Sequence, residues 1–191
     1  MTKKILTALV LSLFIGGTFN SYAGEPVSKG PIAGWHYSDI LKDGNSLYGG
    51  NYNSFFVGFF GNKQLGPTKL LQLNSALMYF QNGSKKDDKN YMKLHYLNIP
   101  ISLRVQVGPV YVLGGINGGV KLGGEQYNDM GLDVDIEDIN TWDAGVHLAL
   151  GGKIGPIGVE AKYNWGIVDL NNGYNSQYLQ LGILFYLGGG K

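Results

Sequence analysis

Cysteine is absent from this 191-residue sequence, and charged residues are scarce. Without cysteine there is no disulfide framework and no thiolate metal site. Only 15% of the residues are charged, and the 15 basic side chains nearly balance the 14 acidic ones. A nucleic-acid-binding domain carries a basic face, so we expect no nucleic-acid partner. The sequence shows no metal-ligand or cofactor motif, and we expect neither a metal nor a cofactor.

Long apolar runs are also missing, apart from one near the N-terminus. The apolar stretch Ile5–Ile15 follows two lysines, and Ser21-Tyr22-Ala23 supplies a small-x-small cleavage site. These are the parts of a secretory signal peptide, whereas a membrane-spanning helix needs about 20 apolar residues. We therefore predict a cleaved signal peptide over residues 1–23 and a single mature domain over residues 24–191.

Glycine is abundant, at 31 residues, and apolar residues recur at every second position. Between Gly158 and Ile167 the odd positions hold Val, Ala, Tyr, Trp and Ile, and the even positions hold Gly, Glu, Lys and Asn. This period of two is typical of a strand with one apolar and one polar face. Glycine disfavours helices. Eight segments follow the pattern, at about 31–40, 53–61, 69–81, 91–107, 110–122, 141–153, 157–169 and 176–188.

Gly-Pro turns separate three pairs of these segments. They are Gly66-Pro67, Gly108-Pro109 and Gly155-Pro156, and such a dipeptide breaks a β-ladder. The other connections are longer and polar. Short periplasmic turns and long extracellular loops are typical of outer-membrane barrels. We predict an all-β, eight-stranded antiparallel up-and-down transmembrane β-barrel in the outer membrane, with both termini in the periplasm. The longer connections are expected at 41–52, 82–90, 123–140 and 170–175.

The two faces of the segments differ in side-chain size. The polar faces are rich in glycine and other small residues, and an eight-stranded barrel has interior space only for its own side chains. The opposite faces carry uninterrupted Trp, Tyr, Leu, Ile and Val, which a soluble surface would not show. We therefore place the polar faces inside, where a paired network plugs the lumen; a soluble barrel that binds a small apolar ligand is the alternative. The expected lumen network is Arg104, Lys121, Asp143, Glu160 and Lys162.

Four motifs in order resemble a known family of small outer-membrane barrels. Tyr96-Leu97-Asn98-Ile99-Pro100 is followed by a Gly-Pro turn and the Gly-rich strand Gly108–Gly124. Asp143-Ala144-Gly145 and the segment Lys162–Ile167 complete the pattern. The order is similar to that of the PorT-like outer membrane protein beta-barrel domain proteins common in the Bacteroidota. The resemblance implies a fold and a location, and it supplies no shared catalytic residues.

Histidine is the residue type that best suggests an enzyme, because some outer-membrane barrels modify lipids with a His beside a Ser or a carboxylate. The sequence has three: His36, His95 and His147. His147 and Asp143 share a face but lie four residues apart, roughly 13 Å along a strand, which is too far for a hydrogen bond. We expect a non-enzymatic barrel with a structural or interaction role through its extracellular loops. A lipid-modifying enzyme is the alternative.

Acidic residues concentrate in the expected connection at 123–140. The arrangement lacks the glycine of a calcium-binding loop, so we interpret it as a solvated extracellular loop that attracts cations or a basic partner. Outer-membrane lipid and another envelope protein are the partners that we expect. The acidic residues are Glu125, Asp129, Asp133, Asp135, Glu137 and Asp138.

Overall fold

The computed structural model describes residues 26–128, 139–170 and 173–187. Eight long strands and one two-residue strand account for most of this part of the chain. In the described residues no helix is long and apolar enough to cross a membrane. The strands are β1 (Pro26–Lys42), β2 (Asn45–Ser46), β3 (Tyr52–Gln64), β4 (Leu71–Asp87), β5 (Asn90–Val107), β6 (Val110–Asn128), β7 (Trp142–Ile154), β8 (Ile157–Gly166) and β9 (Asn175–Phe185).

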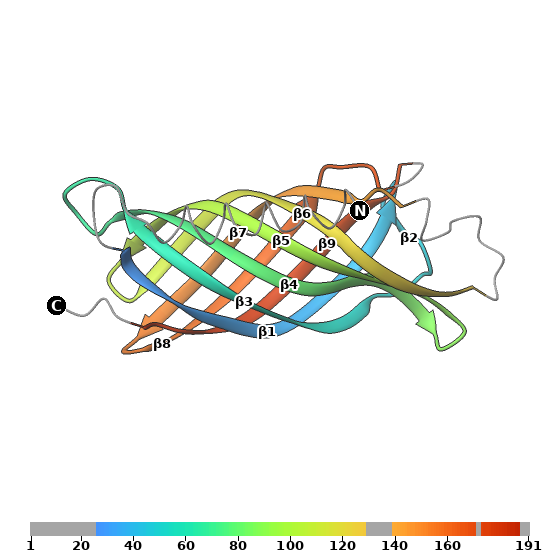
Figure 1. Cartoon of the computed structure of the whole chain (residues 1–191), viewed down its shortest axis with the longest axis horizontal. Helices are drawn as coiled ribbons and strands as arrows, with labels where there is room; N and C mark the ends of the chain where they lie inside the picture. The colour runs from blue at the N-terminus through green and yellow to red at the C-terminus, as the bar shows by residue number, and fades with distance from the viewer. Residues whose placement is uncertain (1–25, 129–138, 171–172, 188–191) are drawn as a thin grey trace, which may run out of the picture.

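The sheet closes on itself. Each long strand pairs antiparallel with the next one along the chain, and β1 also pairs with β9, from Ile32↔Leu184 to Leu41↔Asn175. β2 only extends a hairpin at the end of β1. Figure 1 shows the result as an elongated barrel of tilted strands. The prediction of an all-β, eight-stranded antiparallel up-and-down barrel is confirmed.

Burial alternates along the strands as the period of two predicts. Along β8, Val159 and Tyr163 are exposed, whereas Glu160, Lys162 and Asn164 are buried. Apolar side chains therefore cover the outside, and the lumen holds polar side chains together with an apolar and aromatic cluster that includes Phe56, Phe60 and Phe80. A soluble barrel would have polar side chains on its outside.

The two ends of the barrel differ in their connections. At one end, here the turn end, β5 and β7 are each followed by a two-residue Gly-Pro turn, and Gly108 and Gly155 both have φ 60°. Glycine is favoured there because other residues rarely adopt positive φ. The turn end lies at the left of Figure 1, where β1 begins and β9 ends. The opposite end, here the loop end, carries β2 and the longer connections.

One expected loop and the first residues of another are strand instead. The segment 82–90 is almost entirely strand, because β4 continues to Asp87 and β5 begins at Asn90. β6 likewise continues to Asn128 rather than ending near 122. The continuation of β4 consists of polar residues, with Asn82 and Ser84 buried on the inner side, so it lacks the apolar alternation that marks the rest of the strand.

Candidate functional site

The outer face of the barrel carries an apolar band. Near the loop end this band is bordered by a belt of aromatic side chains, which we call the aromatic girdle. Leu148 and Ile116, in the middle of their strands, expose 58% and 62% of their surfaces. Nearer the loop end, Tyr79 contacts the ring of Phe55, and its hydroxyl lies 2.6 Å from His95 Nδ1. Aromatic side chains with a polar tip suit the boundary between lipid and water. The residues of the aromatic girdle are Trp35, Tyr37, Phe55, Tyr79, Trp142, Tyr163 and Trp165.

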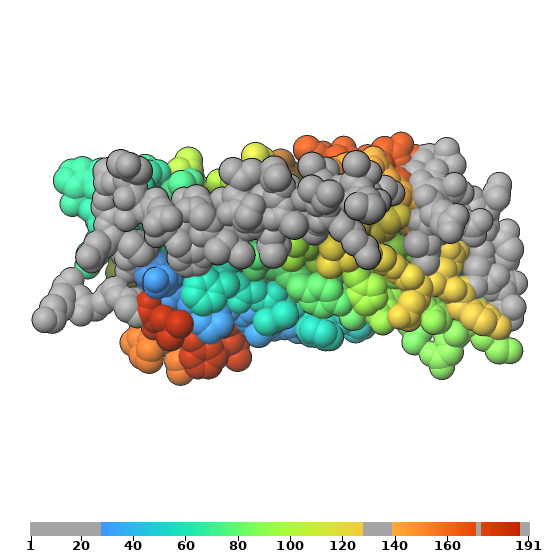
Figure 2. All heavy atoms as spheres, in the orientation of Figure 1, coloured from blue at the N-terminus to red at the C-terminus, as the bar shows by residue number. Residues whose placement is uncertain are grey.

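Three strands continue past the aromatic girdle and project from the loop end. β5 has 18 residues, which at about 3.3 Å rise and a tilt near 40° gives a height of roughly 45 Å. An apolar band is about 25 Å tall, so the ends of β4, β5 and β6 extend well beyond it. Figure 2 shows the tip of the β4–β5 hairpin (green) and the end of β6 (yellow) at the right of the molecule. We call this projecting part of β4, β5 and β6 the sheet extension.

The outer side of the sheet extension is charged. Lys93 lies 3.6 Å from Glu125, across the β5–β6 pair, and both are at least partly exposed. At the hairpin tip, a hydrogen bond from the backbone N–H of Lys89 lowers the pKa of Asp87, and a hydrogen bond to Asp88 raises the pKa of Lys85. These groups therefore stay charged across the physiological range, and the tip presents cations and anions side by side.

Glu125 is the only one of the predicted acidic loop residues that the structure describes. It lies in strand β6 and not in a loop. The sequence pattern of this strand is interrupted by a β-bulge: His95 pairs with Gly123 and Tyr96 with Lys121, which leaves Leu122 as an extra residue. Beyond the bulge the alternation changes phase and the strand continues. Asp129, Asp133, Asp135, Glu137 and Asp138 lie outside the described residues.

An apolar cluster closes the loop end of the lumen. Leu47 and Tyr48, between β2 and β3, turn inward and are at most 8% exposed. Tyr48 receives a hydrogen bond from Gln126 at 3.1 Å, and its backbone N–H donates to Ser84 at 3.2 Å. These bonds fix the connection over the opening. At the loop end the cluster also contains Ile40, Met92, Leu94, Ile139 and Leu170, and it continues along the lumen through Phe80, Phe56 and Phe60 to Tyr186.

The lumen half nearest the loop end holds Asp143 and Lys121 of the predicted network. Asp143 accepts a hydrogen bond from Ser176 at 3.0 Å. Lys121 donates to the carbonyl of Ile139. Each residue has a hydrogen-bond partner that the sequence did not suggest, although Oδ1 of Asp143 has none among the described residues.

The half nearest the turn end brings the other three members together. Lys162 lies 3.2 Å from Glu160. The guanidinium of Arg104 stacks 3.5 Å from the ring centre of Tyr111, whose hydroxyl donates to Glu160 at 3.0 Å. Tyr111 therefore connects Arg104 to the ion pair. We call Arg104, Tyr111, Glu160 and Lys162 the lumen charge cluster.

Tyr111 is the residue that the sequence analysis missed, although a signal was present. It is a large aromatic residue on the inner face of β6, where it packs with Leu113, and its direct partner across the β6–β7 pair is Gly151. A Cβ at Gly151 would lie only 2.2 Å from the ring of Tyr111. The glycine therefore leaves room for the phenol.

Substitution of this glycine tests the packing. We expect Gly151→Ala to displace the Tyr111 ring from Arg104 and Glu160 and to lower the free energy of unfolding by about 1–3 kcal/mol, the usual cost of overpacking. Gly152→Ala is the matched control, because its Cβ would meet no atom closer than 3.6 Å. Denaturant unfolding in lipid vesicles measures both. Equal stabilities of the two variants would contradict the packing role.

A serine and a histidine also meet in the lumen. Ser102 Oγ lies 2.7 Å from His147 Nε2, within the distance of a nucleophile and its base. His147 Nδ1 has no hydrogen-bond partner in the described part of the chain, so nothing orients the ring as a catalytic acid would. Both side chains are at most 4% exposed. Among the described residues there is also no group of three His, Asp or Glu side chains that could hold a metal ion.

Comparison with known proteins agrees with this architecture. Residues 22–172 match the family described as "Outer membrane protein beta-barrel domain". No curated protein matches the sequence significantly. Among solved structures, Neisserial surface protein A aligns over 86% of this chain and 99% of its own, with 15% identity and a TM-score of 0.59.

A second solved structure is Ail, the attachment invasion locus protein of Yersinia pestis, in complex with the heparin analogue sucrose octasulfate. It aligns over 84% of this chain and 98% of its own, with 13% identity and a TM-score of 0.49. At identities this low, the likeness of solved structures concerns the fold.

Proposed function

Because the chain belongs to the outer membrane protein beta-barrel domain family, we propose that it is a closed, non-enzymatic barrel whose structural or interaction role is carried by its loop end. The observation that supports an interaction role best is the sheet extension, which holds a charged face beyond the apolar band on hydrogen-bonded strands. A surface built this way keeps its shape without a partner. Outer-membrane lipid and another envelope protein are the proposed partners. The narrower resemblance to PorT-like members rests on the sequence motifs and is part of the proposal.

The orientation follows from the two ends of the barrel. Short turns of outer-membrane barrels face the periplasm, and β1 begins and β9 ends at the turn end. We therefore place both termini in the periplasm and the sheet extension outside the cell. A signal peptide over residues 1–23 would deliver the mature chain. Because the chain contains no cysteine, Tyr127→Cys introduces a single one. We expect this cysteine to react with a membrane-impermeant thiol reagent on intact cells. Protection of the cysteine would reverse the orientation.

A closed lumen is the second element of the proposal. It is supported by the lumen charge cluster toward the turn end and by the apolar cluster around Leu47 and Tyr48 at the loop end. The residues of both clusters are buried. Eight strands leave space for side chains only. We expect liposomes that contain the purified barrel to show no swelling with small sugars. Steady sugar flux would contradict the closed lumen.

The charged loop end supplies the test of an interaction role. The β6–β7 connection holds five of the six predicted acidic residues, and exposed charges contribute little to stability. We expect the variant D133N/D135N/E137Q/D138N to fold normally and to bind polylysine about tenfold more weakly, since four charge contacts with a polycation in water are together worth roughly 1–2 kcal/mol. The measurement is binding to nanodisc-embedded barrel at two salt concentrations. Loss of the barrel in this variant would instead make the segment structural.

The lipid-modifying alternative depends on the Ser102–His147 pair. Because both residues are buried in the lumen, a lipid on the outer face cannot reach them. An unchanged lipid A profile in a deletion strain is expected, and a changed profile would favour the enzyme.

A further inference from the structure

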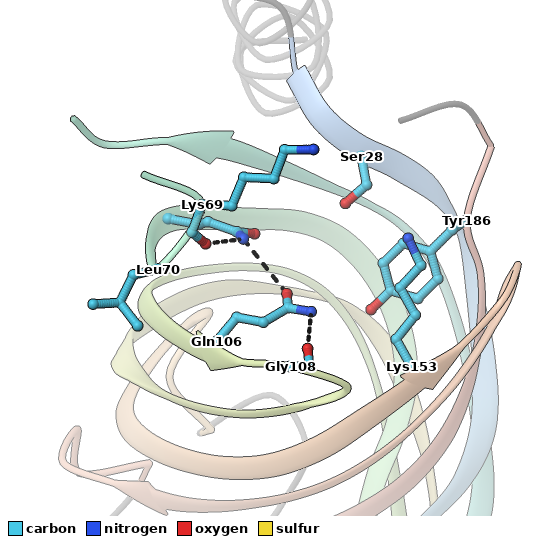
Figure 3. Close-up of a pocket in the computed structure, with 8 residues that line it drawn as sticks. Ser28, Lys69, Leu70, Gln106, Gly108, Lys153 and Tyr186 are labelled. Carbon is cyan, nitrogen blue, oxygen red and sulfur yellow. Dashed lines mark hydrogen bonds between the residues drawn. The ribbon is translucent and has the colours of Figure 1, made fainter. Parts of the chain in front are cut away.

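A cavity of about 330 Å³ opens at the turn end of the lumen. It lies beyond the lumen charge cluster, at the opposite end of the lumen from Leu47 and Tyr48, and its lining includes Tyr186 of the apolar cluster. Figure 3 shows Lys69 and Leu70 on one side of the opening and Lys153 and Tyr186 on the other. The lining residues are Ser28, Lys69, Leu70, Gln72, Gln106, Gly108, Lys153 and Tyr186.

The lining is cationic. It contains two lysines and no carboxylate. The ammonium of Lys153 lies 4.3 Å from the ring centre of Tyr186, and it makes no hydrogen bond or ion pair with any residue that the structure describes. An ammonium group can donate three hydrogen bonds, so Lys153 has its full donor capacity available inside the cavity.

A third cation lies directly behind this lining. Arg104, which is 1% exposed, donates to Tyr186 Oη at 3.2 Å and to Gln106 Oε1 at 2.9 Å. Its Nε has no partner among the described residues. Both of its hydrogen-bond acceptors line the cavity, so its positive charge lies next to the cavity wall.

The charges of this half of the lumen do not balance. Arg104, Lys153 and Lys162 face Glu160 alone among the described acidic residues there, and Glu160 is already bound by Lys162 and Tyr111. Arg104 and Lys162 are buried, whereas Lys153 is partly exposed at the cavity, and positive charges taken out of water need a compensating anion. The described side chains leave that position unfilled on the cavity side.

We propose that this cavity binds an oxyanion of the phosphate class, held by Lys153 and Lys69 and stabilised by the charge of Arg104. The phosphate has two possible sources, free inorganic phosphate and the headgroup of a phospholipid. The exposed side chain of Leu70 at the rim offers an apolar contact to an acyl chain. This proposal goes beyond the interaction role of the loop end and does not depend on it.

Calorimetric titration of the barrel in a phosphate-free maltoside detergent tests the proposal. Inorganic phosphate is expected to bind, and Lys153→Met is expected to weaken binding by about tenfold or more, since a hydrogen bond to a charged group is lost. Lys42→Met is the matched control, because Lys42 also lies over a tyrosine, 5.3 Å from the ring centre of Tyr174, at the loop end. Lys153→Arg keeps the charge and should bind within a few-fold of the unmodified protein. The mobility of unheated samples on a gel shows that each variant is folded.

A second titration, with short-chain phosphatidylglycerol, separates the two sources. Binding of inorganic phosphate that depends on Lys153 supports the free anion, and binding of the lipid alone with the same dependence supports the headgroup. The proposal is overturned if neither ligand binds, or if Lys42→Met weakens binding as much as Lys153→Met does.

Discussion

Glu160→Gln should lower the free energy of unfolding by about 3–5 kcal/mol, the usual cost of leaving buried charges without their partner. The substitution preserves size but removes the single negative charge of the lumen charge cluster. Lys162, 3.2 Å away, and Arg104, connected through Tyr111, would then face each other without compensation. Denaturant unfolding in lipid vesicles measures the loss.

Two further variants separate charge from packing. Glu125→Gln removes an acid of the same type from the exposed pair with Lys93 and should cost less than about 1 kcal/mol. The double variant E160M/K162M removes both charges of the buried pair and should recover much of the stability that Glu160→Gln loses. A loss for Glu160→Gln as small as that for Glu125→Gln would show that water screens the lumen.

Leu148→Arg should lower the free energy of unfolding by about 2–4 kcal/mol, the cost of arginine at the middle of a bilayer. Leu148 lies at the centre of β7 and faces outward with 58% of its surface exposed. Tyr127 is similarly exposed, at 49%, but lies on the sheet extension near the end of β6. Tyr127→Arg should therefore cost less than about 1 kcal/mol. Vesicle unfolding of both variants measures the difference.

Equal costs at the two positions would place the apolar band elsewhere along the barrel. A large cost at Tyr127 alone would move the band toward the loop end, and the sheet extension would then lie within the membrane.

The sequence was sufficient to predict the barrel because each transmembrane strand repeats the same constraint. A side chain faces either lipid or a narrow lumen, and a period of two records this choice along strands such as β7 and β8. The Gly-Pro dipeptides located the short turns for a similar reason, since Gly108 and Gly155 occupy positive φ. These are local requirements, and a single sequence contains them.

The sheet extension could not be predicted in the same way. Outside the membrane both faces of a strand can be polar. The part of β4 around Asn82 and Ser84 therefore shows no alternation of polar and apolar residues. In β6 the bulge at Leu122 changes the phase of the pattern, and a continuous strand therefore resembles a strand followed by a loop.

The lumen contacts depend on geometry that no local pattern contains. The sequence assigned five charged residues to the lumen face, but their heights along the barrel are set by the register of all eight strands. That register places Asp143 beside Ser176 and Glu160 beside Tyr111. The inward turn of Leu47 and Tyr48 has the same cause, since it depends on the space left between distant strands.

The seam between β1 and β9 concentrates the entropic cost of folding in one place. Seven of the long-strand pairings join neighbours along the chain, whereas the seam joins residues such as His36 and Gln180, which are 144 positions apart. The entropy lost on closing a chain segment rises with its length, and contacts at long sequence separation slow folding. Until that one row of hydrogen bonds forms, the sheet has two open edges, and any slip in register there would move lipid-facing side chains into the lumen.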